Sequence, residues 1–155
     1  MQIHIIAIGN RMPAWVDTAF AEYAKRMPAH YRLRLHEVPA CKRTKGADIE
    51  RLLKDECARI QAATPRGCHV IALERTGREL DTSEFVMALR SWLDRGQDVA
   101  LWIGGPEGLA AACGATSHQQ WSLSRLTLAH SLVRVLVAEQ LYRAWSIIEG
   151  HPYHR

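Results

Sequence analysis

Long apolar runs, CxxC cysteine pairs and the common nucleotide-binding signatures are all missing from this sequence. A helix needs about 20 consecutive apolar residues to cross a bilayer, and the longest apolar runs here, residues 3–8 and 135–138, are far shorter. The first residues also lack the basic segment and the small-residue cleavage site that a secretory signal requires. We therefore expect no membrane-spanning helix and a protein that stays in the cytoplasm.

Cysteine is scarce, and its spacing indicates neither a metal site nor a disulfide framework. The four cysteines are Cys41, Cys57, Cys68 and Cys113. Of the eight histidines, only His151 and His154 lie close together, and no cysteine accompanies them. The sequence therefore predicts free thiols and no bound metal.

The chain has the size and composition of one globular domain. Its 155 residues fall within the usual range for a single domain, and 48% of them are hydrophobic while 23% are charged. This is enough apolar material to bury a core, and it excludes a disordered chain or a coiled coil. We expect a single domain that spans residues 1–155.

Positive charge is concentrated in the first part of the chain. Residues 1–66 hold twelve Lys or Arg against seven Asp or Glu, whereas the remainder holds eight against nine. The densest basic stretch, Lys-Arg-Thr-Lys-Gly at residues 42–46, is a flexible loop of the kind that contacts phosphates. Charge alone favours the simpler interpretation of a solvated surface loop.

Strand and helix patterns alternate along the chain. Short apolar runs bounded by glycine or proline predict strands, and amphipathic stretches that open with a capping residue predict helices. Strands are expected at residues 3–8, 31–36, 68–73, 99–103 and 121–123, and helices at 13–27, 48–64, 81–96, 109–113 and 132–148. The alternating strand 31–36 is typical of an edge, and the unbroken run 99–103 of a sheet centre. This order predicts an α/β fold with a largely parallel sheet.

The first and last predicted helices differ in how much apolar surface they carry. In residues 13–27, one apolar stripe is expected to face the core; it consists of Trp15, Ala19, Phe20, Tyr23 and Met27. Residues 132–148 are apolar over nearly the whole circumference of the helix. A helix of this kind needs cover on several sides, so it is either central or part of an oligomer interface.

Glycines follow the predicted central strand at the carboxyl end, where open α/β sheets bind ligands. Gly104, Gly105 and Gly108 permit close approach of the backbone to a ligand. Their spacing matches neither the dinucleotide fingerprint nor a P-loop, and the chain has no G-x-S-x-G elbow. The pattern favours a neutral or cationic cofactor held by backbone groups. The loops after Leu73 and Leu123 occupy the same position in the sheet, although each alone is typical of a plain strand-to-helix connection.

Three longer segments stand out for their order along the chain. They are LWIGGPEGL at residues 101–109, WSLSRLTLAHSLVRVLVAEQLYRAWSI at 121–147 and HPYHR at 151–155. This ordered set resembles the ribosomal large-subunit pseudouridine N3-methyltransferases, the smallest members of the SPOUT class. The opening IHIIAIGNRMPAW at residues 3–15 and the basic loop share the resemblance, which therefore covers essentially the whole chain.

The resemblance implies a single-domain parallel-sheet SPOUT fold whose C-terminal part forms a trefoil knot. Connection rules alone would make such a knot improbable. It also implies methyl transfer from S-adenosylmethionine to N3 of a pseudouridine in 23S ribosomal RNA, carried out by a homodimer on assembled ribosomes. This reaction requires no metal.

The resemblance also assigns residues. Matched position by position, the family's cofactor site falls on Leu73, Gly104, Leu123, Ser124, Arg125, Leu126, Thr127 and Leu128. The family places the C-terminal tail at the active site across the dimer interface, which implies catalytic roles for Tyr153, His154 and Arg155. These side chains offer a stacking face, a titratable imidazole and a phosphate-binding guanidinium. Without the resemblance the tail would be expected to fray, and His130 is the next candidate for the base.

Two other functions account for parts of the pattern. A non-catalytic RNA-binding or ribosome-assembly factor would keep the basic loop but would need no glycine-rich cofactor site. A Rossmann-type oxidoreductase is disfavoured by the missing fingerprint. Binding of S-adenosylmethionine distinguishes the methyltransferase from the assembly factor.

Overall fold

Apolar runs form the parallel strands at the centre of the computed structural model, which describes residues 1–155. The strands are β1 (Gln2–Ile8), β2 (Arg32–Val38), β3 (His69–Glu79), β4 (Val99–Ile103) and β5 (Gln119–Ser122). All four strand pairings are parallel, and the order across the sheet is β2-β1-β4-β3-β5. Every residue of the central strand β4 is buried, and β2 lies at an edge. Both positions confirm the predictions from their patterns.

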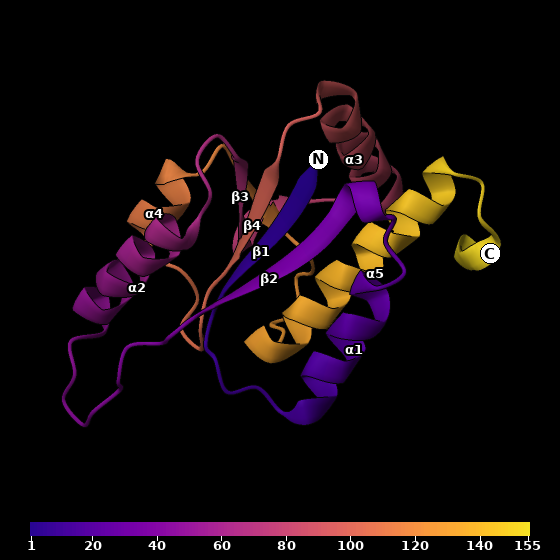
Figure 1. Cartoon of the computed structure of the whole chain (residues 1–155). Helices are drawn as coiled ribbons and strands as arrows, with labels where there is room; N and C mark the ends of the chain where they lie inside the picture. The colour runs from indigo at the N-terminus through magenta and orange to yellow at the C-terminus, as the bar shows by residue number, and fades with distance from the viewer.

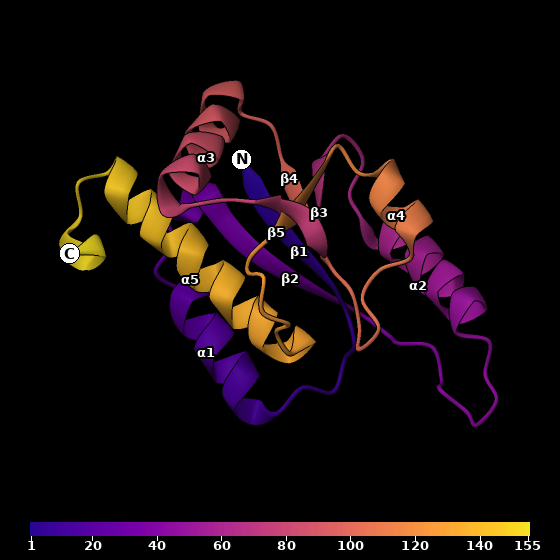
Figure 2. The same ribbon diagram turned by 180° about the vertical axis from the view of Figure 1, so that it is seen from behind.

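Helices cover both faces of this sheet. They are α1 (Ala14–Ala24), α2 (Ile49–Ala63), α3 (Thr82–Arg95), α4 (Ala111–Thr116) and α5 (His130–Ile148), with 3-10 turns η1 (Ala29–Tyr31) and η2 (Pro152–His154). Figure 1 and Figure 2 show α2 and α4 on one face and α1, α3 and α5 on the other. A separate buried cluster lies on each face. The parallel α/β fold is therefore confirmed, whereas the trefoil knot stays a prediction. No helix has the length and apolar character needed to span a membrane.

Capping residues set the starts of two helices where the sequence predicts them. The Asp48 carboxylate accepts a hydrogen bond from the amide of Arg51 at 3.3 Å. Asp81 and Glu84 form a reciprocal capping box, with side-chain contacts to backbone amides of 2.8 and 2.9 Å. These contacts satisfy amides that have no partner in the first helical turn.

Strand β3 extends to Glu79, well beyond the predicted end at Leu73. Its pairing with β5 shifts register after Leu73 and resumes between Arg78 and Trp121. The added residues are polar and mostly exposed, so no apolar run marks them. Gly77 is required in this stretch, because a Cβ there would lie 2.7 Å from backbone atoms of Trp121.

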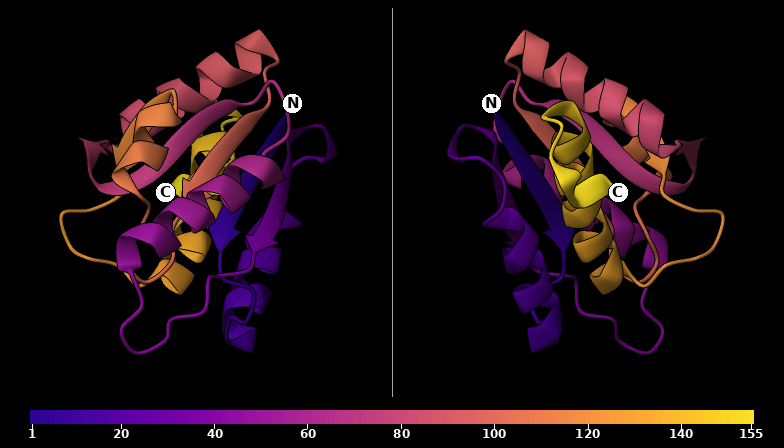
Figure 3. Two further views of the ribbon diagram at one scale, coloured as in Figure 1. Left: turned by 90° about the vertical axis from the view of Figure 1, so that its left-hand side faces the viewer. Right: turned by 90° about the vertical axis from the view of Figure 1, so that its right-hand side faces the viewer.

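The first and last helices use their apolar residues differently from each other. Trp15 is 55% exposed, so its predicted place on the core-facing stripe is wrong. Phe20 and Met27, from the same predicted stripe, are buried. Val16, about 100° around the helix from Trp15, is also buried. On α5, Val137 and Leu141 are fully buried against the sheet. The opposite face of α5 is only partly covered in this chain (Figure 3); its apolar residues are Leu132, Val135 and Leu136.

A disulfide joins α2 to α4, so the prediction of four free thiols is wrong. It links Cys57 to Cys113, whose Cα atoms lie 5.6 Å apart, a normal separation for such a bond. The two residues are 56 positions apart in the chain, and only the packing of α2 beside α4 brings them together. Cys41 and Cys68 are free and buried.

Candidate active site

A cavity of about 640 Å³ opens at the carboxyl ends of β3, β4 and β5. Its volume lies in the range of cofactor sites. It brings together all the predicted cofactor-binding residues except Arg125; those that line it are Leu73, Gly104, Leu123, Ser124, Leu126, Thr127 and Leu128. The Arg125 side chain is 87% exposed and lies 3.8 Å from Glu79 Oε1. The three loops singled out from the sequence therefore line one cavity.

Gly104 shapes the wall of this cavity through its contact with the loop itself. A Cβ at Gly104 would overlap the carbonyl carbon of Gly108 and would lie 2.7 Å from the amide nitrogen of Leu109. Gly105 and Gly108 form a backbone bridge that closes the turn, and Gly108 has a φ of +77°. The absence of a side chain at Gly104 is thus needed by the folded loop before any ligand arrives.

Two carboxylates in the cavity differ in their surroundings. Oε1 of Glu74 is buried and has no hydrogen-bond partner, and burial raises the pKa of this carboxyl. Glu107 accepts hydrogen bonds from the Arg43 guanidinium, which lower the pKa of Glu107. Glu74 is therefore the carboxylate left free to meet a ligand. Sequence reasoning missed it, although an acidic residue directly after the apolar run of β3 is a usable signal.

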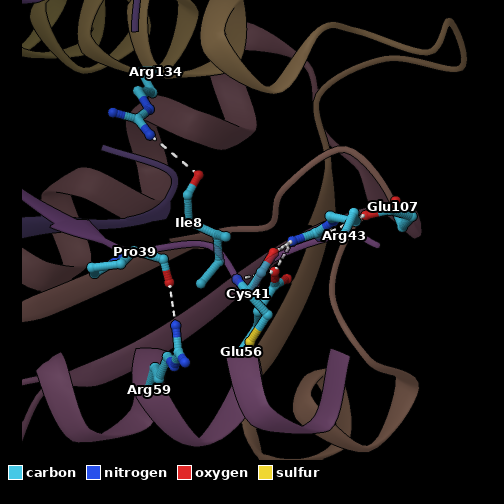
Figure 4. Close-up of polar contacts among 8 residues, drawn as sticks. All are labelled: Ile8, Pro39, Cys41, Arg43, Glu56, Arg59, Glu107 and Arg134. Carbon is cyan, nitrogen blue, oxygen red and sulfur yellow. Dashed lines mark hydrogen bonds and ion pairs between the residues drawn. The ribbon is translucent and has the colours of Figure 1, made fainter. Parts of the chain in front are cut away.

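The basic loop between β2 and α2 contributes Arg43 to a network of ion pairs with two carboxylates (Figure 4). Its guanidinium binds Glu56, which is 2% exposed, and donates to Glu107 Oε2 at 2.6 Å and to the carbonyl oxygen of Cys41 at 2.7 Å. The network ties this loop to the glycine loop. Of the predicted phosphate-contacting stretch, only Lys42 and Lys45 remain as exposed, unpaired cations.

A second arginine, Arg134 on α5, is completely buried. It donates to Glu37 Oε2 at 2.8 Å and to the carbonyl oxygens of Gly9 at 2.6 Å and Ile8 at 3.2 Å; Figure 4 shows the contact with Ile8. These bonds fix the first turns of α5 against the carboxyl ends of β1 and β2. The sequence signal was a lone arginine inside an apolar helical run, which predicts a partner for the buried charge.

His130 begins α5 and lines the cavity. Burial, together with the nearby positive charges of Arg134 and Arg43, lowers the pKa of its imidazole, and Glu107 acts in the opposite direction. A neutral imidazole can accept a proton or a hydrogen bond. This geometry keeps His130 among the candidate catalytic groups.

The predicted catalytic tail lies at the other end of α5 and does not line this cavity (Figure 1). The Tyr153 hydroxyl donates to Glu139 Oε1 at 3.1 Å, and its ring lies 4.6 Å from that of Tyr142. Glu139 is about 14 Å beyond the start of α5 along the helix axis. Nδ1 of His154 is buried without a partner, and Arg155 is exposed. The tail of one chain therefore does not complete the cavity of the same chain.

A comparison with known families identifies the family of this chain. The family model described as "Predicted SPOUT methyltransferase" matches residues 1–154. The chain belongs to the SPOUT methyltransferase family. Two full-length relatives are named ribosomal RNA large subunit methyltransferase H: the protein of Thioalkalivibrio sulfidiphilus (strain HL-EbGR7) is 54% identical, and that of Methylococcus capsulatus (strain ATCC 33009 / NCIMB 11132 / Bath) is 46% identical. Both matches cover the whole of this chain. They cover 99% of the Thioalkalivibrio protein and 100% of the Methylococcus protein.

Solved structures share the fold of this SPOUT methyltransferase. One is a probable methylase family protein from Haemophilus influenzae Rd KW20. The match covers 99% of this chain and 70% of that protein, with a TM-score of 0.61 and 15% identity. A probable methyltransferase from Bordetella pertussis Tohama I matches 92% of the chain and 95% of its own length, with a TM-score of 0.56 and 18% identity. At these identities the likeness concerns the fold alone.

No group of three or more His, Cys, Asp or Glu side chains is placed to hold a metal ion.

Proposed function

We propose that this SPOUT methyltransferase transfers a methyl group from S-adenosylmethionine to N3 of a pseudouridine in 23S ribosomal RNA. It acts as a homodimer on assembled ribosomes in the cytoplasm. The observation that carries the proposal is the cavity of about 640 Å³ formed by the three carboxyl-end loops, in a chain whose full-length relatives bear the name of a ribosomal RNA methyltransferase.

The residues of the cavity suit S-adenosylmethionine. Leucines 73, 123 and 128 offer apolar surface to an adenine ring, and the backbone of the glycine loop and of residues 123–128 offers donors and acceptors to its edge. The unpartnered Glu74 oxygen suits the positive charge of the cofactor. When bound, the cofactor supplies a methyl group activated by a sulfonium.

The acceptor nitrogen needs help that this cavity alone does not give. N3 of a pseudouridine is a weakly acidic imide, so it must lose its proton to a base before or during methyl transfer. We assign the tail of a second copy to the acceptor: Tyr153 for stacking, His154 for proton transfer and Arg155 for a phosphate. The half-covered apolar face of α5 supports a second copy packed there.

Methyl transfer to ribosomes tests the proposal directly. Purified protein, tritiated S-adenosylmethionine and ribosomes from a strain that lacks the gene should give one N3-methylated pseudouridine in 23S rRNA, identified by mass spectrometry. We expect naked rRNA to react at least about tenfold more slowly, because so small a protein reads RNA shape and context rather than sequence. Absence of transfer to ribosomes would reject the function, and equal rates on naked rRNA would reject the requirement for assembly.

Replacement of Glu74 by Gln is expected to raise stability without ligand. Burial raises the folded-state pKa of Glu74 above its unfolded-state value. The contribution of Glu74 to the free energy of unfolding is therefore most favourable below the unfolded-state pKa, and it is lost as the pH rises through the folded-state pKa. Relief of an unpartnered buried carboxylate should therefore raise Tm at pH 8 by about 2–4 °C. The gain should shrink toward pH 4, as followed by circular dichroism melting.

The same substitution should weaken cofactor binding. Loss of a charge-assisted contact is expected to lower the affinity for S-adenosylmethionine about tenfold in calorimetry. The exposed Glu79, on the same strand, gives the control variant Glu79→Gln, which should change neither quantity. A Glu74→Gln variant with wild-type affinity would remove Glu74 from the cofactor site.

A further inference from the structure

A second cavity of about 230 Å³ adjoins the first at the carboxyl ends of β1 and β2. Pro106 and His130 line both cavities, so only these two residues form the shared wall. The volume is below that of a typical cofactor site and suits one flat ring. The other lining residues are Ile8, Gly9, Asn10, Arg11, Met12, Ala40 and Arg43.

The mouth of this second cavity is positive. No acidic side chain lines it. Arg11 is exposed and takes part in none of the ion pairs of the chain. Lys42 and Lys45, also unpaired, lie on the loop after β2, which Figure 1 shows at the carboxyl end of the sheet, as it does the loop after β1. Arg43 is already neutralised by two carboxylates, so Arg11 is the free cation at the cavity itself.

His130 presents a ring nitrogen toward this side. Its Nε2 lies 4.0 Å from the position that a Cβ on Gly9 would take, and Gly9 is another lining residue. The charged groups that face the imidazole are Arg134 from α5, Arg43 from the loop after β2 and Glu107 from the glycine loop, with Arg11 in the same cavity. A neutral imidazole between the two cavities can accept a hydrogen bond from an N–H group of a ring in the second one.

We propose that the second cavity receives the acceptor base, a pyrimidine-type ring with an imide N–H, and that Arg11 holds the adjoining phosphate. His130, in the wall that the two cavities share, accepts a hydrogen bond from an N–H group of the ring and so orients the ring, while the imide proton itself goes to His154 of the second copy. This inference rests on the proposed function, because it needs an RNA acceptor. It assigns to one copy of the chain a binding surface for RNA that is separate from the tail.

The test compares Arg11→Gln and His130→Gln with Arg90→Gln, an exposed and unpaired arginine on α3. Ribosome affinity is measured by co-sedimentation, methyl transfer over a range of ribosome and salt concentrations, and cofactor affinity by calorimetry. For Arg11→Gln we expect ribosome affinity about tenfold weaker, kcat within about twofold of wild type, and a salt slope reduced by about one. For His130→Gln we expect kcat about tenfold lower while ribosome affinity and cofactor affinity stay within about twofold of wild type, because the ring loses the group that orients it.

Several results would overturn the inference. One is that both variants match Arg90→Gln in ribosome affinity and rate. Another is that His130→Gln weakens cofactor binding as much as it slows transfer, which would place His130 in the first cavity alone. Dissociation of Arg11→Gln into monomers in light scattering would place Arg11 at a contact between copies instead. If wild type binds ribosomes with the expected dependence on Arg11 but transfers no methyl group, the proposed function fails while the binding surface stands.

Discussion

Removal of Tyr153, His154 and Arg155 is expected to slow methyl transfer by at least about 100-fold, the usual contribution of a positioned proton-transfer group. Cofactor affinity should stay within about twofold of wild type, since the first cavity lies at the opposite end of α5. A loss of rate without a loss of cofactor binding would show that the tail acts on the acceptor. Single-turnover transfer to ribosomes and calorimetry with S-adenosylmethionine measure the two quantities.

Point variants separate catalysis from folding in the tail. Tyr153 contacts Glu139 and Tyr142, so the truncation should also lower Tm by about 2–4 °C. His154→Ala should reduce the single-turnover rate, whereas Arg155→Ala should mainly weaken ribosome binding, by about tenfold. The control is His151→Asn, which keeps a side-chain acceptor for the Tyr153 amide. Normal transfer by the truncated protein would show that the tail is an ordinary terminus.

Gly104→Ala is expected to lower cofactor affinity by about 100-fold or more, which corresponds to about 2.7 kcal/mol. The added Cβ overlaps backbone atoms of Gly108 and Leu109, so the loop has to open and its amides leave their positions around the cavity. The sequence predicts that Gly104 lets the backbone approach a ligand closely. The structure shows that the space a Cβ would occupy is taken by the loop's own backbone, and Tm should therefore fall as well.

Gly46→Ala provides the matched control for this glycine. Gly46 has a φ of +79°, and no heavy atom lies within 4 Å of a Cβ placed there, so the substitution costs only the left-handed backbone strain, about 1 kcal/mol. Calorimetry should show wild-type cofactor affinity for Gly46→Ala and a large loss for Gly104→Ala. Equal affinities in the two variants would contradict the role of loop closure.

Mixing two inactive variants tests whether the site is shared between copies. The tail-deleted protein keeps the cofactor cavity, and a cavity-filled protein keeps the tail. Thr127→Trp serves for the second, because Thr127 is exposed on the cavity rim and its replacement leaves the core intact. Random reassortment of equal amounts into dimers should restore about a quarter of wild-type activity. No recovery in mixed dimers would exclude a composite site.

The sequence predicted the framework well where local patterns and burial agree. The apolar runs at residues 3–8 and 99–103 became buried strands, and Asp48 and Asp81 cap the helices that they were expected to cap. The prediction from sequence failed where contacts with residues distant in the chain decide the local structure. The polar end of β3 is a strand because β5 pairs with it. Trp15 is exposed although Phe20, from the same predicted stripe, is buried, because the helix turns Val16 rather than Trp15 toward the core.

By itself, the sequence determined the parallel α/β class, the three loops that carry the candidate cofactor site, and membership in a methyltransferase family. It could do so because strand periodicity, glycine positions and motif order are properties of the linear sequence. Only the tertiary structure decided which distant groups meet. It bonded Cys57 to Cys113, placed Arg43 between Glu56 and Glu107, and left Glu74 unpartnered. It also separated the tail from the cavity by most of the length of α5. Contacts of this kind depend on how helices pack across the sheet, and spacing along the chain does not encode them.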